Sequence, residues 1–237
     1  MNWLYLALDI GALTGPLLLS FDRRVAFYRH YRHLFPAIAA MMLVFVPWDM
    51  AFVAGRIWGF DARYVTGVTI GNLPIEEWLF FPVVSYACIF IYECLRYYVP
   101  KSPLERWHRP ILLGIALLGL AIALTHPTRL YSSLKVGTAS AAVLVVLYWL
   151  RPRYLGRFLL TYLLSWPPFL LMNGILTGAF IEGQVVWYAP EHILGLRLGT
   201  IPIEDSYYNL MMLLMTTVVY EILRKRADRA APLPIFA

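Results

Sequence analysis

Charged residues are scarce in this sequence. Asp, Glu, Lys and Arg make up 14% of its 237 residues, whereas 60% are apolar and the mean hydropathy is +0.64. A soluble domain of this size needs more polar surface than such a composition supplies. The formal net charge of +6 does not indicate a nucleic-acid partner, because the basic residues fall between apolar stretches. The composition therefore predicts an integral membrane protein.

Residues and motifs that hold metals, nucleotides or retinal are also missing. The two cysteines, Cys88 and Cys94, are six positions apart in one apolar segment, which suits neither a metal site nor a disulfide. The sequence contains no P-loop and no dinucleotide-binding glycine motif. None of the lysines, Lys101, Lys135 and Lys225, lies well inside an apolar segment, where a retinal Schiff base would form. We therefore expect no metal and no cofactor.

Seven apolar segments are long enough, or nearly so, to cross a bilayer. A hydrocarbon core of about 30 Å requires about 17–25 helical residues. The segments cover residues 2–20, 34–54, 77–98, 110–126, 135–150, 158–179 and 203–224. The sequence therefore predicts an all-α membrane protein with about seven transmembrane helices.

The basic residues support this division and orient it. Alternate connections hold 15 of the 20 basic residues: Arg23, Arg24, Arg29, Arg32, Arg96, Lys101, Arg106, Arg109, Arg151, Arg153, Arg157, Arg224, Lys225, Arg226 and Arg229. The other connections hold Arg56, Arg63, Arg129, Lys135 and Arg197. By the positive-inside rule, the first set lies in the cytoplasm. We therefore expect a multi-pass protein of the cell membrane, with its N-terminus outside and its C-terminus in the cytoplasm.

An internal repeat divides the chain. The motif Gly-Asn-Leu-Pro-Ile-Glu-Glu at residues 71–77 reappears 128 positions later as Gly-Thr-Ile-Pro-Ile-Glu-Asp at residues 199–205, and a Tyr-Glu pair reappears at the same offset. Such a repeat predicts two parallel three-helix units joined by a linker helix, a 3+1+3 arrangement. The predicted boundaries are 1–100 for the first repeat, 101–129 for the linker with the fourth helix, 130–226 for the second repeat and 227–237 for a cytoplasmic tail.

Two adjacent acidic residues end each copy of the motif, Glu76 with Glu77 and Glu204 with Asp205. Acidic residues after a proline are ordinary in the first turn of a helix, because free N–H groups and the helix dipole favour them. One acid would suffice for that role, and ionisable groups inside a helical bundle usually mark a functional site. We expect one acid of each pair to face the interior, and we favour Glu76 and Glu204 because they are identical in both copies.

Further polar residues are expected at both ends of the bundle, some near the acidic motifs and some at the opposite end. Asp49, beside Trp48, aligns loosely with Asn173 of the second copy, which predicts either a polar cluster or an ordinary interfacial aspartate; both alternatives stay open. At the opposite end, Glu93 and Glu221 each precede an arginine by three residues, Arg96 and Arg224 respectively. That spacing predicts structural ion pairs at the helix ends.

Carboxyl groups in an apolar interior favour acid–base chemistry on a hydrocarbon. Burial disfavours the charged form of a carboxyl group, so the group can hold a proton near neutrality. It can then protonate an alkene, aromatic faces can stabilise the resulting cation, and a carboxylate can remove a proton afterwards. Such a reaction moves no net electrons.

The duplicated motifs, with the aromatic residues that follow them, resemble those of the small membrane lycopene cyclases of bacteria, archaea and fungi. They are Gly-Asn-Leu-Pro-Ile-Glu-Glu-Trp-Leu-Phe-Phe and Gly-Thr-Ile-Pro-Ile-Glu-Asp-Ser-Tyr-Tyr. That family includes two-subunit enzymes and the cyclase half of fungal bifunctional enzymes, and it is distinct from the flavoprotein cyclases. Both copies lie in one chain here. The resemblance is therefore to a fused single-chain form that needs no obligate protein partner.

The resemblance implies conversion of the linear ψ ends of lycopene to β-rings, giving γ-carotene and then β-carotene, in contact with membrane lipids. A carboxyl group would protonate C2, the C5=C6 bond would attack the C1 cation, and C6 would lose its proton. The expected catalytic residues are Glu76, Glu77, Glu204, Asp205 and Asp49. The expected substrate-binding residues are Trp48, Trp78, Phe80, Phe81, Asn173, Tyr207 and Tyr208.

Other functions fit the same residues. The cation could be hydrated instead of cyclised, or a C50 carotenoid could be the substrate. A membrane transporter or pigment-binding protein could use the acids as a proton site. That last interpretation is disfavoured because no segment shows the broken mid-membrane helix of many transporters.

Overall fold

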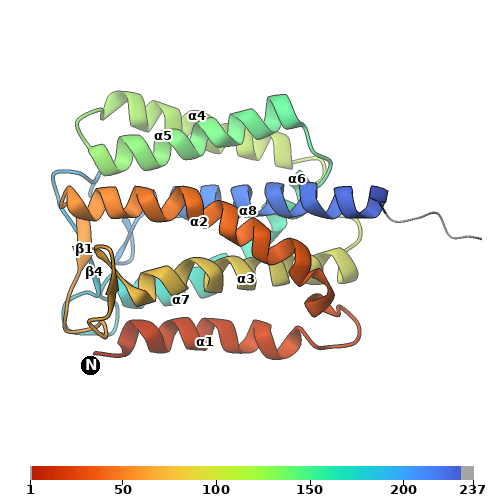
Figure 1. The fold of residues 1–237 in the computed structure, drawn as a ribbon. Helices are drawn as coiled ribbons and strands as arrows, with labels where there is room; N and C mark the ends of the chain where they lie inside the picture. The colour runs from red at the N-terminus through yellow and green to blue at the C-terminus, as the bar shows by residue number, and fades with distance from the viewer. Residues whose placement is uncertain (1, 231–237) are drawn as a thin grey trace, which may run out of the picture.

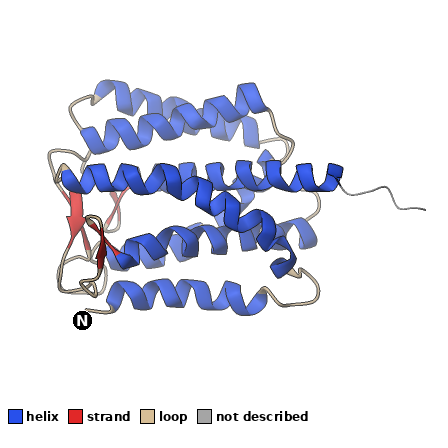
Figure 2. Ribbon diagram, in the orientation of Figure 1, coloured by secondary structure: helices blue, strands red, loops and turns tan. Residues whose placement is uncertain are grey.

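The computed structural model describes residues 2–230, with side chains to residue 227, and these residues are mostly helical (Figure 2). The helices are α1 (Leu4–Leu19), η1 (Phe27–His30), α2 (Tyr31–Ala54), α3 (Ile75–Tyr98), α4 (His108–Thr125), α5 (Leu130–Val145), the π-helical turn η2 (Val146–Leu150), α6 (Leu155–Leu164), α7 (Trp166–Leu176) and α8 (Ile203–Ala230). The strands are β1 (Trp58–Phe60), β2 (Thr69–Ile70), β3 (Leu73–Pro74), β4 (Val186–Tyr188), β5 (Arg197–Leu198) and β6 (Ile201–Pro202). α8 continues into the tail predicted at 227–237, of which residues 231–237 lie outside the described residues.

Each of the seven predicted segments is mainly helical. Four continuous helical stretches are long and apolar enough to cross a membrane: residues 27–54, 75–98, 108–125 and 130–150. α6 and α7 together make a fifth if the bent pair is one span, and α1 is apolar but only 16 residues long. The described part of the chain therefore has the helices of a membrane protein.

The sixth predicted segment is not one continuous helix. α6 and α7 meet near Ser165 at an angle of 45°. Pro167 and Pro168 follow in the first turn of α7 and have no backbone N–H to bond the preceding turn. The Ser165 hydroxyl donates to the Tyr162 carbonyl at 2.7 Å, which satisfies an acceptor at the bend. The expectation that every segment is unbroken is therefore wrong.

The long helices lie side by side and roughly parallel (Figure 1). In the first repeat α1 packs on α3, and in the second α5 packs on α8. α2 of the first repeat packs more extensively on α8 of the second than on its own α3, and α3 packs on α6. α4 packs on α5 at the edge of the bundle farthest from α1 (Figure 1). The two repeats therefore share one interlocked core.

The described strands all lie at one end of the bundle (Figure 2). β1 and β4 pair antiparallel across the two repeats, with Gly59 opposite Trp187. A Cβ on Gly59 would lie 2.7 Å from the Trp187 ring, so only glycine permits this approach. The β2–β3 and β5–β6 hairpins turn at Gly71 (φ 66°) and Gly199 (φ 64°), in the left-handed region that favours glycine. The first residue of each repeated motif is therefore a turn glycine.

An ion-pair network joins α3 to α8 at the other end. Both predicted pairs are confirmed: Arg96 with Glu93 at 2.9 Å, and Arg224 with Glu221 at 3.2 Å. Arg96 also pairs with Glu221. In addition, Tyr92 donates to Glu221 at 2.8 Å and Tyr220 donates to Glu93 at 2.7 Å, so each repeat supplies a hydroxyl to the other.

The packing of α4 depends on Gly119. A Cβ there would lie 2.7 Å from the Tyr207 ring and closer still to the Ser140 hydroxyl. We expect Gly119→Ala to lower the thermal unfolding midpoint of the purified protein in detergent, because overpacking a tight contact costs about 1–3 kcal/mol. Gly114→Ala in the same helix is the control, since its Cβ would meet nothing within 4 Å. Equal midpoints for the two variants would contradict this packing.

Candidate active site

The four acids of the repeated motif are all buried, but they have two different environments. Glu76 accepts the backbone N–H of Thr66, and Glu204 accepts that of Leu194, each at 2.7 Å. Both donors lie ten residues before their acid, in the loop that leads into the hairpin. Glu204 also accepts the Ser132 hydroxyl. Glu76 and Glu204, which the sequence analysis favoured as the interior pair, therefore hold loops in place and do not line the cavity described next.

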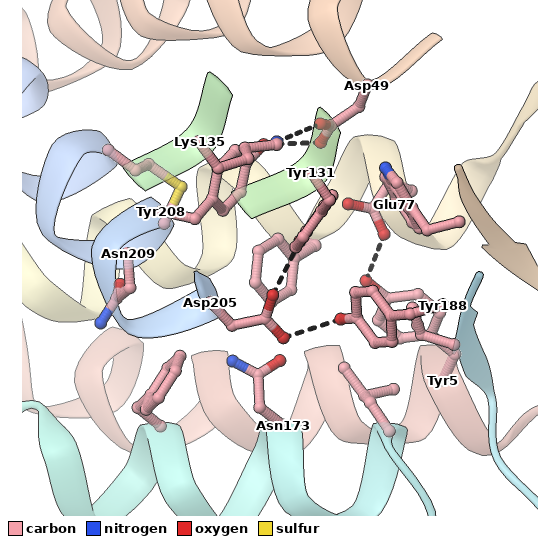
Figure 3. Close-up of a pocket in the computed structure, with 16 residues that line it drawn as sticks. Tyr5, Asp49, Glu77, Tyr131, Lys135, Asn173, Tyr188, Asp205, Tyr208 and Asn209 are labelled. Atoms are coloured by element: carbon pink, nitrogen blue, oxygen red, sulfur yellow. Dashed lines mark hydrogen bonds and ion pairs between the residues drawn. The ribbon is translucent and has the colours of Figure 1, made fainter. Parts of the chain in front are cut away.

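A small cavity of about 50 Å³ lies near the strand end of the bundle. Three carboxyl groups from three helices line it: Asp49 of α2, Glu77 of α3 and Asp205 of α8 (Figure 3). Asp49 is 1% exposed, so it belongs to a buried polar cluster rather than to a wet interface. Within residues 2–230, no group of three or more His, Cys, Asp or Glu side chains is placed to hold a metal ion.

Tyrosine hydroxyls donate hydrogen bonds to the second acid of each motif. Tyr5 of α1 donates to Glu77 Oε2 at 2.6 Å, and Tyr131 of α5 donates to Asp205 Oδ1 at 2.7 Å (Figure 3). Asp205 Oδ2 accepts a further hydroxyl, from Tyr188 of β4, at 2.7 Å. Burial and then the nearby Asp205 charge raise the pKa of Tyr188 well above its ordinary value, so this hydroxyl remains a donor. Asp205 thus has two tyrosine donors, whereas Glu77 has one.

Lys135 corrects one expectation from the sequence. It lies in the second turn of α5 and is 2% exposed, whereas it was expected in a polar connection. The difference arises because α5 begins at Leu130, five residues earlier than expected. Lys135 Nζ pairs with Asp49 Oδ1 at 2.7 Å, and Tyr208 donates to Asp49 Oδ2 at 2.5 Å (Figure 3). The pair ties α2 to α5.

Aromatic rings surround the Lys135 ammonium. Its Nζ lies 3.3 Å from the ring centre of Tyr208, 5.1 Å from that of Trp48, 5.2 Å from that of Phe52 and 5.7 Å from that of Tyr131. The negative faces of such rings attract a cation, most strongly where water is excluded. Together with Asp49 they compensate for the lost hydration of the buried charge.

Four of the seven expected substrate-binding residues lie in or beside the cavity, and three make contacts away from it. Phe80, Asn173 and Tyr208 line the cavity, and Trp48 contacts Lys135 beside it. The remaining three serve elsewhere: Trp78 donates to the Ile70 carbonyl at 3.2 Å, Tyr207 donates to the Ile115 carbonyl at 3.2 Å, and Phe81 packs against Phe45 and Phe80.

Several lining residues escaped the sequence analysis: Tyr5, Tyr131, Lys135, Phe169, Tyr188 and Asn209. The sequence does contain a pattern that links Tyr5, Tyr131 and Lys135. Tyr5 and Tyr131 are 126 positions apart, and each precedes a polar residue by four positions, Asp9 or Lys135. A two-residue shift in the alignment of the repeats brings these two tyrosines to the same position. Tyr188, in a loop strand, carries no such signal.

A second, larger cavity of about 440 Å³ adjoins the first. Its walls come mainly from α1, α3 and α7, with Asn209 of α8, and most of the lining residues are apolar. Four residues line both cavities: Phe80, Phe169, Asn173 and Asn209. The polar cluster therefore lies at the end of an apolar groove.

The family profile and the similar proteins both carry the name lycopene cyclase. The profile of the family described as lycopene cyclase matches residues 2–95 and 128–223. A bifunctional lycopene cyclase/phytoene synthase of Aspergillus niger is 26% identical over 178 residues, 71% of this chain and 28% of that protein. The protein of the same name from Arthroderma gypseum is 27% identical over 218 residues, 82% of this chain and 34% of that protein. No solved structure matches the chain.

The chain spans about a third of the length of the curated relatives it matches. The two ranges matched by the family profile each contain one copy of the repeated acidic motif, and together they cover well over half of the sequence. By this match, the chain belongs to the lycopene cyclase family.

Proposed function

We propose that this protein cyclises the linear ends of lycopene to β-rings, forming γ-carotene and then β-carotene. One observation carries the proposal: three buried carboxyl groups, Asp49, Glu77 and Asp205, line a cavity with aromatic walls inside a bundle of apolar helices. A hydrocarbon dissolved in the bilayer needs a proton donor, a proton acceptor and cation-stabilising rings to cyclise. The names of the relatives, lycopene cyclase/phytoene synthase, support this substrate.

The reaction is an isomerisation. A carboxyl group gives a proton to C2 of the terminal C1=C2 bond, which leaves a tertiary cation at C1. C6 of the C5=C6 bond then bonds to C1, and the positive charge moves to C5. Loss of the C6 proton to a carboxylate restores the C5=C6 bond in the ring. One proton enters and one leaves, so no oxidant or reductant is consumed.

We infer different roles for the three carboxyl groups from their hydrogen bonds. Asp49 is engaged by an ammonium partner and a tyrosine donor, so we give it no part in proton transfer. Asp205 has two tyrosine donors and suits the proton acceptor. Glu77 has a single tyrosine donor, on Oε2, so its charge is the least stabilised of the three. We assign Glu77 as the proton donor.

The seven-helix arrangement is part of the same proposal. α1, α2, α3, α4, α5 with η2, α6 with α7, and α8 would be the seven spans, in two repeats (1–100 and 130–226) joined by residues 101–129. Equivalent bonds in the two halves support the duplication, such as Tyr5 with Glu77 and Tyr131 with Asp205. The basic connections support an outer N-terminus and a cytoplasmic tail at 227–237, with the acids near the outer face.

Removing either acid should stop turnover. We expect Glu77→Gln and Asp205→Asn each to reduce cyclisation at least about 100-fold, because general acid–base catalysis contributes about 10²- to 10⁴-fold. Pigments extracted from bacteria that accumulate lycopene and express each variant would be separated by chromatography, and their amounts divided by the amount of inserted protein.

The exposed loop carboxylate Glu191 provides the control, as Glu191→Gln should retain parental turnover. Glu76→Gln separates the two acids of the first motif. Full activity in Glu77→Gln together with none in Glu76→Gln would reverse the assignment made from the hydrogen bonds.

Lys135 should matter for stability because it neutralises Asp49. We expect Lys135→Met to lower stability by about 3–5 kcal/mol, since it leaves a buried charge without its partner. Adding Asp49→Asn should restore most of the unfolding midpoint, because the pair is then removed as a whole. Lys101→Met, at an exposed lysine, is the matched control. A single Lys135→Met variant as stable as the parent would refute this role.

A further inference from the structure

The larger cavity is open along α1. The residues Ala7, Gly11 and Gly15 lie four positions apart on that helix, line the cavity and are exposed. A Cβ on either glycine would meet nothing within 4 Å. On the opposite wall, Leu171 of α7 is 62% exposed. The cavity is therefore a groove that reaches the outer surface of the bundle, where lipid would lie.

The inner end of this groove meets the acid cavity at a polar junction. Asn173 and Asn209 line both cavities, and both lie near Asp205 (Figure 3). Asn209 is 4% exposed, and its Oδ1 has no hydrogen-bond partner among the described residues. The junction between the two cavities therefore offers a buried polar atom to a bound molecule.

Within residues 2–230, the face of the second repeat that corresponds to this opening is covered. Gly137 follows Tyr131 by six residues, as Gly11 follows Tyr5. A Cβ on Gly137 would lie 3.1 Å from Ala123 of α4, whereas one on Gly11 would meet nothing. The linker helix α4 therefore covers in the second repeat the face that is open in the first.

The second repeat also has a packed side chain at the position equivalent to Phe80. Tyr208 occupies the motif position that corresponds to Phe80, three residues after the second acid. Its ring packs on Phe45 at 5.1 Å between ring centres, and its hydroxyl bonds Asp49. Asp49 also pairs with Lys135, and these side chains line the acid cavity together with Tyr208.

We propose that the groove between α1, α3 and α7 binds the polyene chain of a carotenoid, with one end group in the acid cavity. We also propose that it is the single entry, so the two ends are cyclised in separate binding events. The inference rests on the proposed function for the identity of the ligand. From Ala7 to Pro16 the groove runs about 14 Å along α1, at 1.5 Å per residue. A linear tetraterpene is longer, so its remainder would extend into the bilayer.

A single entry determines the order of events. After the first ring forms, the molecule must leave the groove before its other end can reach Glu77. The monocyclic product is therefore released into the membrane and binds again. A chain with two entries could hold one substrate at both ends and form both rings without release.

Filling the groove tests the binding site without depending on turnover. Glu77→Gln protein, purified from bacteria that accumulate lycopene, should retain bound lycopene, measured by its absorbance relative to protein. Adding Gly11→Trp or Gly15→Trp should reduce the bound pigment at least tenfold. Adding Gly114→Trp, on an exposed position of α4 where a Cβ also meets nothing within 4 Å, should leave it unchanged.

The binding results separate the two proposals. Undiminished lycopene in both groove variants would overturn the groove assignment even if the parent is an active cyclase. Loss of lycopene in these variants, with no cyclic product from the parent, would support the groove and reject the cyclase. Saturation at two lycopene molecules per chain would overturn the single entry, for which we expect one.

Release of the intermediate can be measured directly. Proteoliposomes containing the parental chain would receive isotopically labelled lycopene and an excess of unlabelled γ-carotene. We expect label to accumulate in γ-carotene, because the unlabelled compound competes for rebinding. Passage of label into β-carotene at the rate seen without the competitor would show that both rings form in one binding event, and would refute separate binding.

Discussion

The need to satisfy carboxyl groups inside an apolar bundle governs this structure. The buried acidic residues that have donors in the described part of the chain are Asp49, Glu76, Glu77, Glu93, Glu204, Asp205 and Glu221, whereas neither carboxyl oxygen of Asp9 has a hydrogen-bond partner there. A buried polar group without partners costs several kcal/mol in an environment where water cannot replace them. The donors come from every part of the fold: tyrosines of α1 and α5, a lysine of α5, loop N–H groups and an arginine of α3. These contacts fix how the helices and end loops fit together.

Duplication supplies this pattern twice, but the two copies are not used alike. Tyr5 and Tyr131 make the same bond to the second acid of their own repeat. One turn further along, the first repeat has Asp9 and the second has Lys135. The lysine forms an ion pair with Asp49 and stabilises its charge, and α4 covers the same side of the bundle. On this side of the bundle the second repeat is covered by α4, whereas the first has an open groove along α1.

The apolar helices and the repeat could be predicted from the sequence, because hydropathy and the acidic motifs are both visible in short stretches of residues. The sequence was insufficient for Lys135, since the polar residues at the start of α5 hid that this helix begins at Leu130. The bend at Ser165 had a visible cause in Pro167 and Pro168, but hydropathy alone treats such a segment as continuous. Long-range partners such as Tyr188 depend on how a loop strand packs, which no local pattern specifies.

The adjacent acids illustrate why a structural and a functional interpretation need not compete. Successive residues on a helix point about 100° apart. Glu76 therefore reaches back to the loop and accepts the Thr66 N–H, while Glu77 points into the cavity and accepts the Tyr5 hydroxyl. A single acid could not fix the loop and also remain available to a substrate. The pair separates these positions, because the loop-binding carboxylate anchors the wall of the cavity and its neighbour faces the cavity, where the proposed function has it exchange a proton.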